Sequence, residues 1–102
     1  MKFSIEEIAF FERDVRLRMP FRFGVVTLTA APQAFVRARV RLADGTTGEG
    51  MAAELLAPKW FDKNPRYSNE DNFDQLRAAL GLARELYLDG VSDTAFGHFA
   101  RH

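Results

Sequence analysis

Hydrophobic and polar residues alternate most regularly between Ala34 and Gly50, in the stretch AFVRARVRLADGTTGEG. Apolar side chains take every second position and arginines take the positions between them. The apolar positions are Val36, Ala38, Val40 and Leu42, and the arginines are Arg37, Arg39 and Arg41. A period of two is typical of a β-strand with one buried face. The stretch therefore predicts a strand whose arginines face outward.

Asp44-Gly45 follows this strand and favours a two-residue hairpin turn, because glycine accepts positive φ without steric cost and aspartate tolerates it. Thr46 to Ala53 is then expected to return beside the first strand. Gly48 and Gly50 weaken the return strand or let another backbone approach it closely. The centre of the chain is predicted to be an antiparallel hairpin.

The N-terminal segment predicts one long strand from Phe3 to Met19. Most of its apolar residues share the odd parity, namely Phe3, Ile5, Ala9, Phe11, Val15, Leu17 and Met19. Ile8 and Phe10 interrupt the polar face, so we expect another element to cover them. Pro20 cannot donate to a ladder and is expected either to end the strand or to place it at the edge of a sheet. Pro20 to Pro32 is predicted to be a loop whose middle can be extended at Val25 to Thr29.

The segment from Met51 to Ser68 has no sustained period and contains two prolines. It nevertheless carries Leu55, Leu56, Trp60 and Phe61. Because apolar side chains gain nothing from exposure to water, this irregular segment is expected to pack on something.

Ser68 predicts the start of a helix, with Asp71 at the capping-box spacing. Apolar residues then recur at helical spacing, at Phe73, Leu76, Leu80, Ala83 and Tyr87. This helix is expected to end at Asp89-Gly90. A second capping signal at Ser92-Asp93 predicts another helix from Thr94 to His102, with Phe96 and Phe99 on it.

These elements predict an α+β fold in which a three-stranded antiparallel β-meander precedes an incomplete helical part. The sheet is expected over residues 1–53, an irregular loop over 54–67 and the helices over 68–102. A chain of 102 residues is a single domain that can bury about 65% of its unfolded surface.

Composition narrows the function classes. Lys+Arg and Asp+Glu number 14 each, so no net field attracts nucleic acid or acidic membranes. There is no cysteine, which excludes disulfides and thiol catalysis and favours a cytoplasmic location. No apolar run approaches the roughly 20 residues of a membrane span. The 10 phenylalanines indicate an aromatic core or rings that face a partner.

Few residues suggest chemistry of their own. His98 and His102 stand four apart, as metal ligands on a helix can, but without a third ligand we interpret them as surface histidines. The three arginines are interpreted as a solvated strand face, and Glu49 and Glu54 as ionised surface carboxylates. A hairpin explains Gly45, Gly48 and Gly50, which match no phosphate-binding pattern.

The chain resembles the N-terminal capping domain of the enolase superfamily, in its mandelate racemase and muconate lactonizing enzyme branch. The resemblance rests on RLRMPFRFG at 16–24, FVRARVRLADG at 35–45 and TGEGMAAE at 47–54, followed by the helix from Ser68. One position departs from the pattern. Family members often have glutamate after the second glycine of the third strand, whereas this chain has Met51 there and Glu54 three residues on.

The resemblance implies a lid that closes over a (β/α)₈ barrel of roughly 250 residues. In that family the barrel holds Mg²⁺ and removes a proton next to a carboxylate, while two loops of the capping domain select the substrate. Those loops correspond to Pro20–Gly24 and Met51–Trp60. The resulting lid candidates are Phe21, Arg22, Phe23, Leu55, Lys59 and Trp60. Core packing explains Phe21, Phe23, Leu55 and Trp60 equally well.

No catalytic or metal-binding residue is expected in this chain, because the Lys-x-Lys pair and the carboxylates of the barrel are absent from it. The expected partners are the barrel domain of the same enzyme, a small carboxylate substrate through that enzyme, and further copies of the chain. A stand-alone module that binds a small ligand or another chain is the alternative, and nucleic-acid binding by the arginine face is a third hypothesis.

Overall fold

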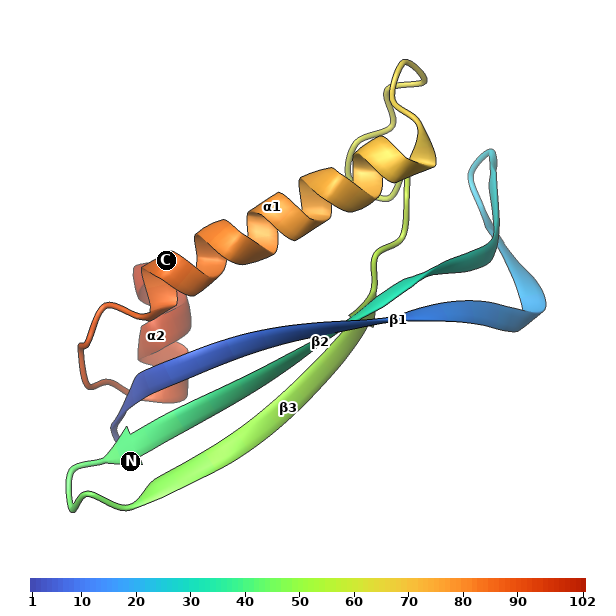
Figure 1. The fold of residues 1–102 in the computed structure, drawn as a ribbon. Helices are drawn as coiled ribbons and strands as arrows, with labels where there is room; N and C mark the ends of the chain where they lie inside the picture. The colour runs from blue at the N-terminus through green and yellow to red at the C-terminus, as the bar shows by residue number, and fades with distance from the viewer.

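A computed structural model describes all residues from Met1 to His102. The elements are β1 (Phe3–Phe23), β2 (Val26–Leu42), β3 (Thr47–Leu55), α1 (Asn69–Tyr87) and α2 (Ala95–Arg101). The strands form one antiparallel sheet in the order β1-β2-β3, which confirms the predicted meander and the α+β class. Figure 1 shows α1 lying along one face of the twisted sheet and α2 beside the start of β1.

The first two strands are longer than predicted. The loop expected from Pro20 to Pro32 is wrong except for its extended middle at Val25 to Thr29, most of which belongs to β2. β1 continues to Phe23, a tight turn at Gly24 and Val25 follows, and β2 starts at Val26. The ladder is irregular between Arg16 and Phe21, the interval that contains Pro20. Pro20 is not paired in the ladder, so its lack of an N–H costs no ladder hydrogen bond. The strand can therefore continue through Pro20.

A second irregularity of β1, between Ile5 and Glu7, exchanges its two faces. An extra residue in one strand reverses the parity of everything after it. Phe3 pairs with Leu42, but Ile8 then pairs with Ala38 on the same face, so the single odd-numbered face predicted for this strand is wrong beyond Ile5.

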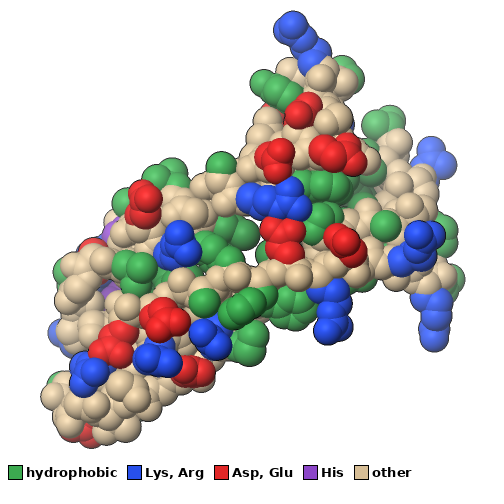
Figure 2. Space-filling model, viewed as in Figure 1, with side chains coloured by type: hydrophobic (Ala, Val, Ile, Leu, Met, Phe, Trp, Pro, Cys, Tyr) green, Lys and Arg blue, Asp and Glu red, His purple; other side chains and the backbone are tan.

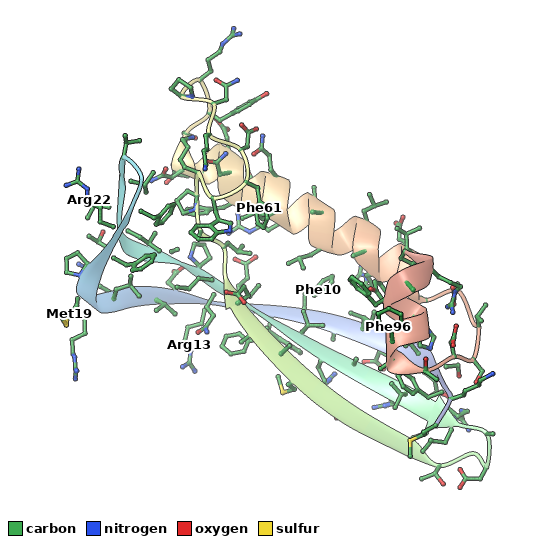
Figure 3. The ribbon with its side chains drawn as sticks, turned by 180° about the vertical axis from the view of Figure 1, so that it is seen from behind. Phe10, Arg13, Met19, Arg22, Phe61 and Phe96 are labelled. Carbon is green, nitrogen blue, oxygen red and sulfur yellow. The ribbon has the colours of Figure 1, made fainter.

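The face of Ile8 and Phe10 is the face covered by α1, which confirms that these residues have a covering element. The Arg84 guanidinium of α1 lies 5.2 Å from the centroid of the Phe10 ring. Figure 3 shows Phe10 beneath the helix. A cation held over an aromatic face is a favourable contact, so it helps to hold α1 against β1.

The second hairpin turns through three residues, Ala43 to Gly45, instead of the predicted two. The Gly45 N–H donates to the Leu42 carbonyl at 2.9 Å, and the Leu42 N–H donates to the Thr46 carbonyl at 2.8 Å. Gly45 has φ +86°, the left-handed conformation that closes a three-residue hairpin. β3 accordingly runs over Thr47–Leu55, where Thr46 to Ala53 was expected.

Ser68 caps α1 as predicted. Its hydroxyl accepts the Asp71 N–H at 3.0 Å and the Asp71 carboxylate accepts the Ser68 N–H at 2.9 Å, which completes a capping box. The helix ends at Tyr87, just before Asp89-Gly90. The cap of α2 is Thr94, not Ser92-Asp93, because the Thr94 hydroxyl accepts the Gly97 N–H at 3.0 Å.

Few side chains are fully buried, because α1 stands off part of the sheet. The buried residues are Leu28, Ala31, Pro32, Ala34, Leu56, Pro58, Asn72 and His98. No helix has both the length and the apolar character that crossing a membrane requires.

Candidate functional site

An apolar groove of about 880 Å³ separates α1 from the sheet. This space is called the apolar groove below. Its lining includes Leu28, Ala34, Val36, Ala52, Ala53, Leu76, Ala79, Leu80 and Ala83, together with Phe21, Phe23, Leu55, Trp60 and Phe61. Of 17 lining residues, 16 are hydrophobic, and the exception is Glu54. Figure 2 shows hydrophobic atoms in the hollow between the helical side and the sheet, with charged side chains around it.

Small side chains on facing elements leave the groove unfilled. Ala34 of β2, Ala52 of β3 and Ala83 of α1 carry one methyl group each and cannot span the space between sheet and helix. Protein interiors are otherwise close-packed, so a hollow of this size is unusual in a small domain. The volume is within the range of about 300–1,000 Å³ found for small-molecule sites.

α1 is tied to the β1 side of the groove. Arg77 donates to both carboxylate oxygens of Glu12, at 2.7 and 2.8 Å, and also to Asp74 at 2.8 Å. The paired Glu12 carboxylate raises the pKa of Arg77 above its ordinary value, and Arg77 lowers the pKa of Glu12. No hydrogen bond or ion pair joins α1 to β3. On the β3 side of the groove, α1 and the sheet therefore have no polar tie.

Aromatic rings from both expected lid loops meet at one end of the groove. The Phe21 and Phe23 ring centroids are 5.7 Å apart, and the Trp60 ring stands edge-on to Phe23 at 5.1 Å with an interplanar angle of 71°. Edge-to-face pairs at this separation are attractive. Trp60 is still 52% exposed, so the cluster lies at the mouth of the groove. Figure 3 shows Phe61 on the same side of the molecule.

The structure brings together five of the six lid candidates. Phe21, Phe23, Leu55 and Trp60 line the groove. Lys59 lines an adjoining cavity of about 700 Å³ with Lys63, and this cavity shares Phe23 and Trp60 with the groove. Arg22 lies apart, and Figure 3 shows it pointing away from the molecule at the tip of the β1–β2 hairpin.

Asn72 is a buried polar residue that the sequence analysis missed. Its side-chain oxygen accepts the Lys59 backbone N–H at 3.2 Å and the Lys59 ammonium at 2.9 Å, and its amide donates to Gln75 at 3.0 Å. Asn72 is only 3% exposed. The helical spacing could have indicated this burial, because Asn72 lies four residues before Leu76, on the apolar stripe of α1.

The predicted arginine face is confirmed as the face turned away from α1, but its charges are paired. Arg37 lies 3.4 Å from Glu7, Arg39 lies 3.1 Å from Glu49, and Arg41 bonds Glu6. The hydrogen bond to Glu49, more than any other contact, raises the pKa of Arg39. Cross-strand carboxylates therefore neutralise the cations that the nucleic-acid hypothesis would need to be free.

His98 is buried, so its interpretation as a surface histidine is wrong. Its Nε2 lies 2.7 Å from the Phe3 carbonyl, and its Nδ1 lies 3.2 Å from an Arg101 nitrogen. Since a carbonyl can only accept, Nε2 carries the proton and Nδ1 accepts from Arg101. His102 instead faces Asp89 at 3.2 Å. The two histidines thus serve to hold α2 in place.

Carboxylates complete this anchor of α2. Arg101 lies 2.9 Å from Asp89 and 2.7 Å from Asp93, whose backbone bridges to Phe3 of β1. The pKa of Asp89 is lowered to about 2, first by the Val91 N–H and then by Arg101. The Thr94 N–H and Arg101 likewise lower the pKa of Asp93.

Chemically, the groove offers an almost wholly apolar surface. No group of three or more His, Cys, Asp or Glu side chains is placed to hold a metal ion. Glu54 is the one acidic group in the lining of the groove, and no basic partner contacts it. Comparisons of the chain with protein-family models, with curated proteins and with solved structures gave no match.

Proposed function

We propose that the chain is the substrate-selecting lid of an enolase-superfamily enzyme of the mandelate racemase and muconate lactonizing enzyme type. The support comes from the resemblance in sequence, from the order of a β-meander followed by helices, and from the geometry of the two lid segments. The runner-up is a self-contained binding module with the same fold.

The contact between Phe23 and Trp60 carries this proposal. The two rings come from separate segments, Phe23 from the end of β1 and Trp60 from the loop between β3 and α1, yet their centroids lie 5.1 Å apart. A lid that selects a substrate needs its two loops at one end of the domain, so that both reach the same ligand. Together with Phe21 they present an apolar, half-exposed surface there.

In this proposal the chemistry belongs to the barrel. The barrel supplies Mg²⁺ and the base that removes a proton next to the carboxylate, and this chain contributes exclusion of water and selection of the substrate. Phe21, Phe23 and Trp60 favour a substrate with an apolar or aromatic body. The 102-residue chain by itself is then expected to turn over no 2-hydroxy acid.

The expected partners follow from the same proposal. A barrel domain would cover the exposed rings Trp60 and Phe61 at the lid. Without such a cover, burial of apolar surface favours self-association, at about 25 cal/mol per Å². A cytoplasmic location stays a prediction from the cysteine-free sequence.

Substitution of Trp60 in the barrel-containing enzyme tests the lid. Trp60→Ala is expected to change the ratio of kcat/KM between an aromatic and a small aliphatic substrate by about tenfold, because it removes a contact made with the substrate body. Phe99→Ala is the control, since Phe99 is also an exposed ring, at 66% against 52% for Trp60, but lies on α2. An unchanged ratio for Trp60→Ala, or an equal change for Phe99→Ala, would reject the lid.

The volume of the apolar groove favours the alternative of a stand-alone ligand-binding module. In that case the pure chain should bind one hydrophobic dye molecule per monomer with a saturable isotherm, and Ala83→Trp should abolish binding by filling the groove. Binding without saturation would instead indicate a general apolar surface.

A further inference from the structure

We infer that the free edge of β3 is a homodimer interface, at which two copies join into one continuous antiparallel sheet across a two-fold axis at Met51. The inference does not depend on the proposed lid function. It rests on the exposure of β3, on the direction of its unpaired backbone groups and on its sequence.

β3 is an open edge over its whole length. Its residues from Thr47 to Glu54 are all exposed, and no other segment pairs with its outer side. Figures 1 and 3 show, from opposite directions, that no ribbon lies alongside this edge. An edge strand of this kind is a template for pairing with another strand.

β1, at the other edge of the sheet, has the features that prevent such pairing. Its ladder is irregular at two places, and it contains Pro20 and several charged residues in alternation. Bulges, proline and charge are the usual protection of an edge strand. β3 has neither the bulge nor the proline: its register with β2 runs without a shift from Thr47 to Leu55. Its only charged residues are Glu49 and Glu54, and it has no lysine or arginine.

The odd-numbered residues of β3 direct their backbone groups outward. The Thr46 carbonyl accepts from Leu42, and the Leu56 N–H donates to Pro32, so the even-numbered residues face β2. Backbone groups alternate in direction along a strand. Thr47, Glu49, Met51, Ala53 and Leu55 therefore leave both N–H and C=O groups free for a partner.

A two-fold axis at Met51 pairs every one of these outward residues. Met51 then faces the partner's Met51, Glu49 faces the partner's Ala53, and Thr47 faces the partner's Leu55. Each is a hydrogen-bonded antiparallel pair. No like charges stand opposite each other, which would otherwise destabilise the pairing. A second copy of the chain is thus a complementary partner for this edge.

Single cysteines test this register, because the chain contains none of its own. Opposed residues of a hydrogen-bonded pair have Cα atoms about 5.5 Å apart, within disulfide range. Met51→Cys should form a disulfide-linked dimer under mild oxidation. A mixture of Glu49→Cys and Ala53→Cys should also cross-link, whereas Glu49→Cys alone should not. Met19→Cys is the control, since Met19 is 74% exposed against 66% for Met51 but lies on β1.

Sedimentation of the unmodified chain gives a second readout. We expect a mass of about twice 11.6 kDa at micromolar concentration. Met51→Lys should raise the dissociation constant at least about tenfold, by placing two ammonium groups at the axis. Met19→Lys should leave the constant unchanged. A monomeric wild-type chain, or equal cross-linking of Met51→Cys and Met19→Cys, would overturn the inference.

Discussion

The side-chain oxygen of Asn72 accepts two hydrogen bonds from a single residue, Lys59, one from its backbone N–H at 3.2 Å and one from its ammonium at 2.9 Å. Lys59 is also the one non-glycine residue with positive φ, at 64°. An unfavourable backbone conformation persists where its surroundings determine it. Asn72 of α1 therefore holds the loop that carries Trp60.

Asn72→Ala is expected to destabilise the domain by about 1–3 kcal/mol, because it leaves the partly buried Lys59 N–H without an acceptor. It should also speed proteolytic cleavage between residues 56 and 67. Chemical denaturation and limited trypsin digestion measure the two effects. Asn69→Ala is the control on the same helix, because the Asn69 side chain makes no hydrogen bond and is exposed. Equal midpoints for the two variants would contradict the role of Asn72.

Gly45→Val should lower the free energy of unfolding by about 1–3 kcal/mol, because a β-branched residue resists the positive φ that closes the second hairpin. Gly50→Val is the matched control: Gly50 lies in β3 without positive φ, and an added Cβ would meet nothing within 4 Å. Urea denaturation compares the two variants. A Gly45→Val midpoint equal to that of the wild type would show that Gly45 does not have positive φ in this turn.

Gly97→Ala is expected to destabilise α2, although alanine is the better helix former. A Cβ at Gly97 would overlap the Asp93 carboxylate, which the Thr94 N–H and Arg101 hold in place. Gly81→Ala in α1 meets no atom within 4 Å and should instead stabilise by about 1 kcal/mol. Thermal unfolding followed by circular dichroism should shift in opposite directions for the two variants, and shifts of the same sign would refute the contact.

Acid should loosen α2 through Asp89 and Asp93. Both pKa values are lowered in the folded chain, that of Asp89 to about 2. A carboxyl with a lowered folded pKa stabilises the fold above its unfolded pKa of about 3.9, and this contribution is lost as the pH falls toward the folded value. Between about pH 4 and pH 2, the hydrogen-exchange protection factors of the α2 amides should therefore fall.

Asp89→Asn should flatten this dependence, because the variant has no carboxyl to protonate at that position. Glu70→Gln is the control, since Glu70 is exposed at the start of α1 and forms no ion pair. An undiminished pH dependence in Asp89→Asn would show that other groups govern the anchor.

Local sequence patterns predicted the parts of the fold that local chemistry determines. The alternation of apolar residues and arginines located β2, and Ser68 with Asp71 located the start of α1. The bulge between Ile5 and Glu7 was not predictable, because an inserted residue leaves no mark in composition and simply reverses the parity that follows. The loop predicted after Pro20 was wrong for a related reason, since proline is excluded from regular ladders but tolerated at irregular ones.

Four of the six lid candidates line the groove, but the sequence did not predict the shape of the groove. The resemblance grouped Phe23 with Trp60, and the structure places them in contact. The apolar groove depends on alanines from three elements that meet only in the folded chain. The burial of His98 depends on the Phe3 carbonyl, which is distant in sequence and gives no periodic signal.

The mass of the polypeptide that carries this sequence in its natural source tests the central claim most directly. An antibody against residues 56–67, which lie between β3 and α1, can isolate it for intact-mass spectrometry. Native gel filtration can show what accompanies it. The lid proposal predicts that these residues occur with a (β/α)₈ barrel of roughly 250 residues, in one polypeptide or in a stable complex. A polypeptide of 11.6 kDa that purifies without a barrel would contradict the proposal and favour a self-contained module.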